Sequence, residues 1–100
     1  MFVHVVNFWL KKGLSEQEIQ AFEIGVKSLA QIESIKDFNV GKPAKTERPV
    51  IDRSYDYCLL TTFEGEAGHD YYQTAPIHLE FIKNCAQYWD RILIYDSETI

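Results

Sequence analysis

The chain has 100 residues, of which 46% are hydrophobic, and a net charge of −5. This length allows one domain with one core, and no segment approaches the roughly 18 apolar residues of a membrane span. The ten basic residues are scattered and outnumbered by fifteen acidic ones, so we expect no nucleic-acid partner and no membrane partner. Lysines follow the first apolar run instead of preceding it, unlike a secretory signal, which favours a cytoplasmic protein.

The first half of the chain predicts a strand, a helix and a second strand. Residues 2–10 are β-branched and aromatic and are apolar on both faces, as is typical of a central strand. Ser15 and Glu18 have the spacing of a capping box, so we expect a helix from about 15 to 32. Residues 35–41 predict a shorter strand at the edge of the sheet, because only one of their faces is apolar.

The second half of the chain predicts two further strands and two helical segments. Residues 42–54 contain prolines and many charges, which predicts a long loop at a rim of the fold. Residues 55–63 predict a second strand with apolar side chains on both faces. Residues 66–73 indicate a short helical turn, a helix over 76–87 begins with a proline, and 88–96 predict the last strand.

This βαββαβ order predicts an α+β, ferredoxin-like fold with a four-stranded antiparallel sheet, in one domain over residues 1–100. Right-handed connections place the strands at 2–10 and 55–63 side by side at the centre. Because helices cover only one face of such a sheet, the second apolar face predicts a homodimer that packs sheet against sheet. The alternative is a monomer with a ligand groove on that face.

The cysteines and histidines give little support for a metal or cofactor site. Cys58 and Cys85 lack metal-ligand spacing and are expected to be free thiols in the core. No two histidines are four residues apart on a helix, so we expect no metal. His69 lies in the polar stretch EGEAGHD and is expected to be exposed. No cofactor is expected; haem is an alternative only because related ferredoxin-like dimers bind it through one histidine.

Four segments occur in an order that carries a family resemblance. They are HVVNF at 4–8, VIDRSYDYCLLTTF at 50–63, YYQTAPIHLEFI at 71–82 and YWDRILIYD at 88–96. Together they resemble the stress-responsive dimeric α/β-barrel (Dabb) family from about residue 2 to 96. The resemblance implies a homodimer whose two four-stranded sheets pack into a barrel, with a stress-associated role and no assigned reaction.

The resemblance also implies a site. The plant polyketide cyclase branch of the family, which makes olivetolic acid, uses a tyrosine and a histidine that match Tyr72 and His78. These two residues are the predicted catalytic pair. The predicted ligand-binding wall consists of His4, Tyr57, Leu59, Phe81 and Trp89. The chain has Ala75 where many members have a second histidine, and Tyr57 stands where the cyclase has one.

Several functions stay open. The first is a stress-associated dimer that binds a small apolar ligand; the second is a cofactor-independent cyclase or isomerase. In the second, neutral His78 accepts a proton and Tyr72 donates a hydrogen bond to the developing oxyanion. A small ferredoxin-like monooxygenase is a third candidate. His78 could instead be structural, and an open apolar cavity with converging polar groups would favour the enzyme over the binding protein.

Overall fold

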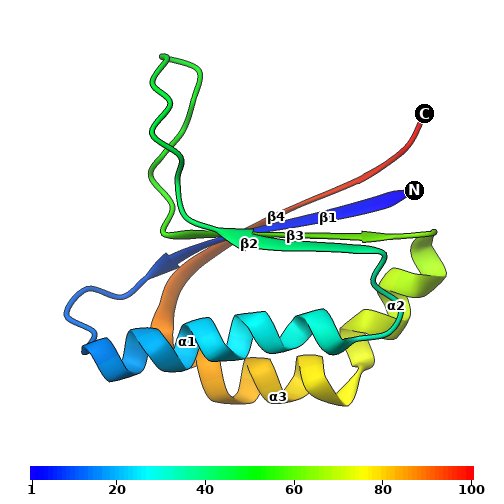
Figure 1. The fold of residues 1–100 in the computed structure, drawn as a ribbon, viewed down its shortest axis with the longest axis horizontal. Helices are drawn as coiled ribbons and strands as arrows, with labels where there is room; N and C mark the ends of the chain where they lie inside the picture. Colours follow the sequence, from blue (N-terminus) through cyan, green and yellow to red (C-terminus); the bar gives the residue numbers. More distant parts are fainter.

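The computed structural model describes residues 1–100 and confirms the predicted order of elements (Figure 1). The strands are β1 (Phe2–Leu10), β2 (Asp37–Gly41), β3 (Tyr57–Phe63) and β4 (Trp89–Glu98). The helices are α1 (Glu16–Ser28), α2 (Glu66–Thr74) and α3 (Pro76–Cys85), with 3-10 turns η1 (Leu29–Gln31) and η2 (Ala86–Tyr88). The polar stretch after β3 is therefore a nine-residue helix rather than a short turn.

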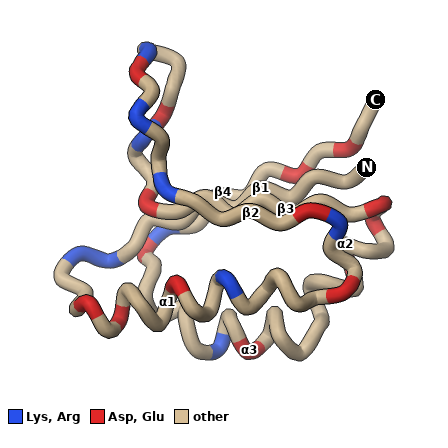
Figure 2. The backbone as a smooth tube through the Cα atoms, in the orientation of Figure 1, with Lys and Arg blue, Asp and Glu red and all other residues tan.

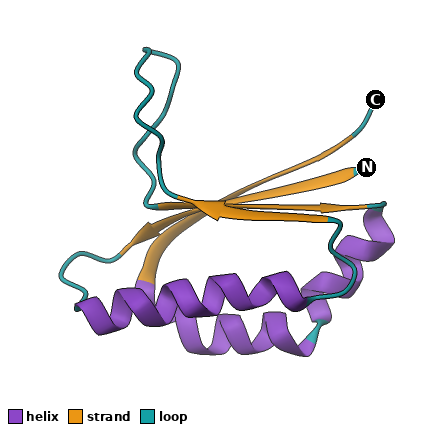
Figure 3. Ribbon diagram, in the orientation of Figure 1, coloured by secondary structure: helices purple, strands orange, loops and turns teal.

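The four strands form one antiparallel sheet in the order β2-β3-β1-β4, and the helices lie together on one side of it (Figure 3). β1 and β3 are the central pair, as predicted from their two apolar faces. β2 lies at an edge, also as predicted, and β4 forms the other edge. The sheet therefore has one covered face and one open face.

Helix α1 begins and packs as its sequence predicts. The Ser15 hydroxyl accepts a hydrogen bond from the Glu18 amide at 3.1 Å, and the Glu18 carboxylate accepts one from the Ser15 amide at 2.9 Å. A Cβ atom on Gly25 would lie only 2.5 Å from the Sγ of Cys85 on α3. The two helices can approach this closely because Gly25 has no side chain. Cys85 is buried and Cys58 half-buried, and both are free thiols.

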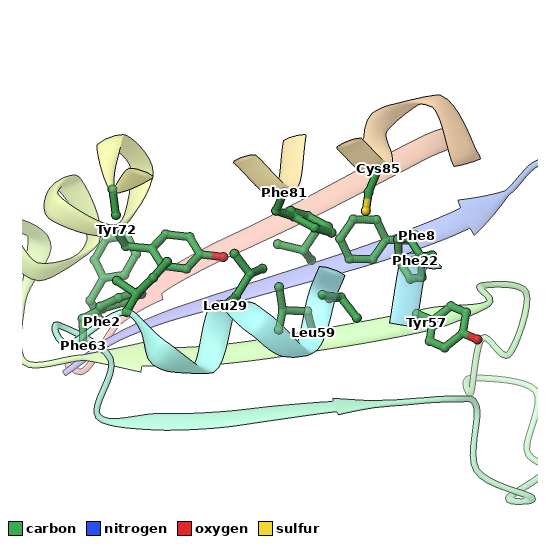
Figure 4. Packing of buried hydrophobic residues seen from close by; sticks show 14 residues of the cluster. Phe2, Phe8, Phe22, Leu29, Tyr57, Leu59, Phe63, Tyr72, Phe81 and Cys85 are labelled. Atoms are coloured by element: carbon green, nitrogen blue, oxygen red, sulfur yellow. The ribbon is translucent and has the colours of Figure 1, made fainter. Parts of the chain in front are cut away.

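The core lies between the covered face of the sheet and the helices. Its largest members are aromatic, and Figure 4 shows them in a row along the sheet. Phe22 on α1 and Phe63 on β3 have no exposed surface at all. The rings of Phe8 and Phe22 meet edge to face at 5.2 Å, an arrangement that favours aromatic pairs. The helices pack against this row of rings, and the rings form part of the walls of the cavities between the helices and the sheet.

The open face of the sheet has no helix over it. Val5, Leu60 and Leu93 are half-buried there, and Tyr95 is 62% exposed. The loop 42–56 projects on this side of the sheet, opposite the helices (Figure 1). Both tryptophans are half-buried: the Trp9 ring nitrogen donates to the Ser54 hydroxyl at 3.3 Å, and Trp89 packs against the core.

Charged residues are spread over the helices and loops, with several lysines and arginines on the loop 42–56 (Figure 2). Every helix is too short or too polar to cross a lipid bilayer.

Candidate functional site

A cavity of about 220 Å³ lies under the helices, between β1, β3 and β4 on one side and α2 and α3 on the other. Five of the seven predicted site residues line it. They are His4, Leu59, Tyr72, His78 and Phe81. Ile92 and Ile94 on β4, which the sequence did not single out, complete its apolar wall. The cavity is thus mainly apolar, and four polar side chains line it, those of His4, Tyr72, Gln73 and His78.

His4 is held in place by Asp96 across the β1–β4 pair. The two residues are register partners, and the His4 Nδ1 atom lies 2.5 Å from the Asp96 Oδ1 atom. A carboxylate can only accept, so Nδ1 carries the hydrogen and Nε2 of neutral His4 is left as an acceptor. Burial lowers the pKa of His4 below its usual value, and this effect outweighs the opposite influence of Asp96.

Tyr72 is at the centre of the polar group. Its side chain is 1% exposed, and its ring centroid lies 4.7 Å from that of His78 and 5.6 Å from that of His4. The hydroxyl makes no hydrogen bond within the chain, and burial alone acts on its pKa. Burial raises the pKa of Tyr72, so the phenol keeps its hydrogen and acts as a donor near neutral pH.

His78 is the third residue of α3, directly after the Pro76 break. Its Nδ1 atom is buried and has no hydrogen-bond partner. Burial lowers the pKa of His78, His4 lowers it further, and the nearby backbone of Gln73 opposes the shift. The imidazole is therefore neutral near pH 7 and able to accept a proton.

His69 corrects one prediction. It was expected to be exposed but is only 8% exposed, with its ring stacked on Phe2 at 4.5 Å and 4.6 Å from the ring of His4. The reason is that α2 is amphipathic: His69 and Tyr72 are one turn apart and share the face that packs on the sheet. The Nε2 atom of His69 is buried without a hydrogen-bond partner.

Two predicted wall residues lie elsewhere. Tyr57 is at the opposite end of the core, where its hydroxyl donates to the Glu23 carboxylate and Lys42 lies 5.7 Å above its ring. It lines a separate small cavity with these two residues. Trp89 packs its ring 5.1 Å from that of Phe8 and does not line the His78 cavity.

Sequence reasoning also missed Asp96 and the burial of His69. A sequence signal for each was present. His69 is three residues before Tyr72 in a helical segment. Asp96 follows the apolar Ile92 and Ile94 at every second position, so the three share one face of the strand. The fold brings His4, His69 and Asp96 together, with one ligand atom from each within 4.8 Å of the others. These three are the residues able to hold a metal ion.

The chain shares its fold with several solved structures. It is 25% identical to a protein of Arabidopsis thaliana, with 100% of this chain and 96% of that one covered and a TM-score of 0.79. A Dabb family protein with a ferredoxin-like fold from Mesorhizobium loti is 23% identical, with 99% and 96% covered and a TM-score of 0.79. The hydroxynitrile lyase of Passiflora edulis is also 23% identical, with 99% and 95% covered and a TM-score of 0.77.

Solved neighbours from Thermobifida fusca and Jannaschia are dimeric ferredoxin-like proteins of unknown function. A search of curated protein sequences gives no significant match. The model of the stress-responsive A/B barrel domain matches residues 2–99, and the chain therefore belongs to the Dabb family.

Proposed function

We propose that this Dabb protein binds a small, mainly apolar carbonyl compound in the His78 cavity and moves a proton on it without a cofactor. The observation that carries the proposal is the pairing of Tyr72 with His78 on an otherwise apolar wall. Burial favours the phenol form of Tyr72 and the neutral form of His78, which are the forms that acid–base catalysis requires.

The two groups have complementary roles in such a reaction. A nitrogen of His78 takes a proton from the carbon next to the carbonyl, and the electron pair moves to the carbonyl oxygen. The Tyr72 hydroxyl stabilises the resulting enolate by donating a hydrogen bond. Return of the proton to a different carbon gives an isomerisation. Attack of the enolate carbon on a second carbonyl of the same molecule gives a cyclisation, and the proton on His78 passes to the new alkoxide oxygen. Both belong to the cofactor-independent cyclase or isomerase class.

The open form and the size of the cavity favour a cyclase or isomerase over a protein that only binds a ligand. A filled space around Tyr72 would favour a binding protein, whereas the space here is open. At about 220 Å³ it has the volume of roughly seven water molecules in the liquid, which limits the substrate to a compact molecule. The name of the Passiflora edulis neighbour, hydroxynitrile lyase, is consistent with enzyme activity on this fold.

Exchange of carbon-bound hydrogen tests the proposal before a substrate is known. Compact cyclic ketones are incubated with the protein in D2O, and loss of the hydrogens next to the carbonyl is followed by NMR. We expect His78→Ala to lower the exchange rate by about a hundredfold or more. Tyr72→Phe should lower it less, and Tyr57→Phe, which alters the other end of the core, should leave it unchanged.

Two results would contradict the proposal. An exchange rate that is the same with and without protein would remove the catalytic role. A His78→Ala variant with a lower melting temperature but no change in exchange or ketone binding would show that His78 is structural, bridging α3 to the backbone at Gln73. The cytoplasmic location and the absence of a nucleic-acid partner remain predictions.

For the assembly, we propose that two copies pack through the open faces of their sheets. Val5, Leu60 and Leu93 offer apolar surface there that a monomer leaves half-exposed to water. Light scattering should give about twice the 11.7 kDa chain mass. Leu60→Glu should shift the protein towards the monomer, whereas Leu79→Glu on the outer side of α3 should not. A wild-type monomer at micromolar concentration would contradict this arrangement.

A further inference from the structure

We propose that His4, His69 and Asp96 form a binding site for one divalent transition-metal ion, beside the His78 cavity. The residues come from three separate elements, β1, α2 and β4, and meet where these elements cross. Each offers one donor atom, and the three atoms lie within 4.8 Å of one another. Two imidazole nitrogens and one carboxylate oxygen are a common donor set for zinc and for non-haem iron.

The strongest support is the buried nitrogen of His69. Its Nε2 atom has no hydrogen-bond partner although the residue is only 8% exposed. Folded proteins rarely leave such an atom without a partner, because its lost contacts with water are not replaced. The ring is held by stacking on Phe2, so it is not free to turn towards solvent. A metal ion between His69 and His4 would satisfy this nitrogen.

The distances fit a site that closes around its ion. Bonds from zinc to these donors are about 2.0–2.2 Å long, so donor atoms around one ion lie about 3.4 Å apart. The widest separation here, at most 4.8 Å, must therefore shorten by about 1.4 Å when the ion binds. The Nδ1–Oδ1 pair of His4 and Asp96 is now 2.5 Å apart and would open slightly as the ion replaced their shared hydrogen.

Access and charge also fit. His4 and His69 are buried, but the Asp96 side chain is 39% exposed and gives a divalent ion a path from solvent. Three protein ligands leave at least one coordination position open. Tyr72 lies next to both histidines, with ring centroids 5.6 and 6.2 Å away.

The site does not depend on the proposed proton transfer. His78 and Tyr72 are not among the three ligands, and metal binding is read directly rather than through activity. Zn2+ is titrated by calorimetry into protein stripped with EDTA, and Co2+ is added in parallel because its visible spectrum reports the donor geometry. We expect one ion per chain, a higher melting temperature with Zn2+, and a Co2+ spectrum of low coordination number.

Variants decide whether these residues bind the ion. His69→Leu and Asp96→Asn should each weaken Zn2+ binding at least tenfold. His69→Leu should also leave the metal-free fold intact, since it replaces a nitrogen without a partner by an apolar group. His78→Gln is the matched control and should bind Zn2+ as wild type does, although it removes the proposed base.

Equal Zn2+ affinity in wild type and His69→Leu would overturn the proposal, as would the absence of binding to wild type. Loss of ketone exchange in His78→Gln with Zn2+ binding retained would support both proposals. Zn2+ binding in a wild-type protein that has no exchange activity would leave the metal site standing and remove only the catalytic role.

Discussion

The two ends of the interface between the helices and the sheet each contain a buried tyrosine, but only one of the two hydroxyls is hydrogen-bonded within the chain. At one end, the Tyr57 hydroxyl donates to Glu23, and Lys42 lies above the ring. At the other end, the Tyr72 hydroxyl has no partner in the chain and belongs to the wall of a cavity with His4 and His78. Both tyrosines are at most 6% exposed, so burial alone does not distinguish them.

The difference shows where the fold favours stability and where it leaves polar groups available. The Tyr57 end is packed by aromatic rings around Phe22, each with its centroid within 6.4 Å of the Phe22 ring centroid. The Tyr72 end contains all three histidines of the chain, and His69 and His78 each have a buried ring nitrogen without a partner. Because such atoms lower stability, their concentration at one end indicates a ligand or metal site there.

The largest expected effect is at the packed end. Phe22 is fully buried and contacts the rings of Phe8, Tyr57, Phe81 and Trp89. Phe22→Ala should lower the free energy of unfolding by about 3–5 kcal/mol, through lost burial and the cavity left behind. Urea denaturation at a fixed protein concentration measures this, because the stability of the proposed dimer would depend on concentration. A loss below about 1 kcal/mol would show that the packed end does not dominate stability.

A smaller effect should separate the two tyrosines. Tyr57→Phe removes a hydrogen bond to a carboxylate and should lower the free energy of unfolding by about 1 kcal/mol. Tyr72→Phe removes a hydroxyl without a partner and should change it by less than about 0.5 kcal/mol. The same urea denaturation serves for both. Equal losses would mean that the Tyr72 hydroxyl is bonded in solution, and the contrast between the ends would fail.

The sequence predicted the fold well because the central strands are rich in β-branched and aromatic residues and are apolar on both faces. The strand at 2–10 was placed at its observed bounds, and the capping box placed the start of α1. Errors occurred at ends without strong patterns: β2 and β3 each begin two residues later than predicted, at Asp37 and Tyr57. The apolar content of both faces of β1 and β3 also predicted their central positions.

The site was predicted only in part, for a physical reason. Tyr72 and His78 were predicted from the family resemblance, together with their spacing on either side of Pro76. The burial of His69 depends on which face of α2 meets the sheet, and a stretch as polar as EGEAGHD gives a weak apolar pattern. Tyr57 was predicted to line the ligand site because it shares a strand face with Leu59. It lies nearer the other end of the core and lines a different cavity.

The smallest expected effect is a pH dependence of stability that arises from the histidines at the Tyr72 end of the core. The pKa of His78 in the folded chain is lowered from its usual 6.5, first by burial and then by His4 and His69. As the pH falls below about 6.5, the unfolded chain therefore takes up this proton before the folded chain does. Stability should be full above that pH and fall progressively as the pH is lowered towards the folded pKa.

His78→Gln tests this assignment, because glutamine does not titrate in this range. In metal-free protein, the fall in unfolding free energy between pH 7 and pH 5 should be smaller in His78→Gln than in wild type. Some fall should remain, since burial also lowers the pKa of His4. Tyr57→Phe, at the packed end, should keep the wild-type slope while its curve is displaced downward. An identical slope in wild type and His78→Gln would mean that His78 is protonated as readily in the folded chain as in the unfolded one, and its role as a neutral base would be lost.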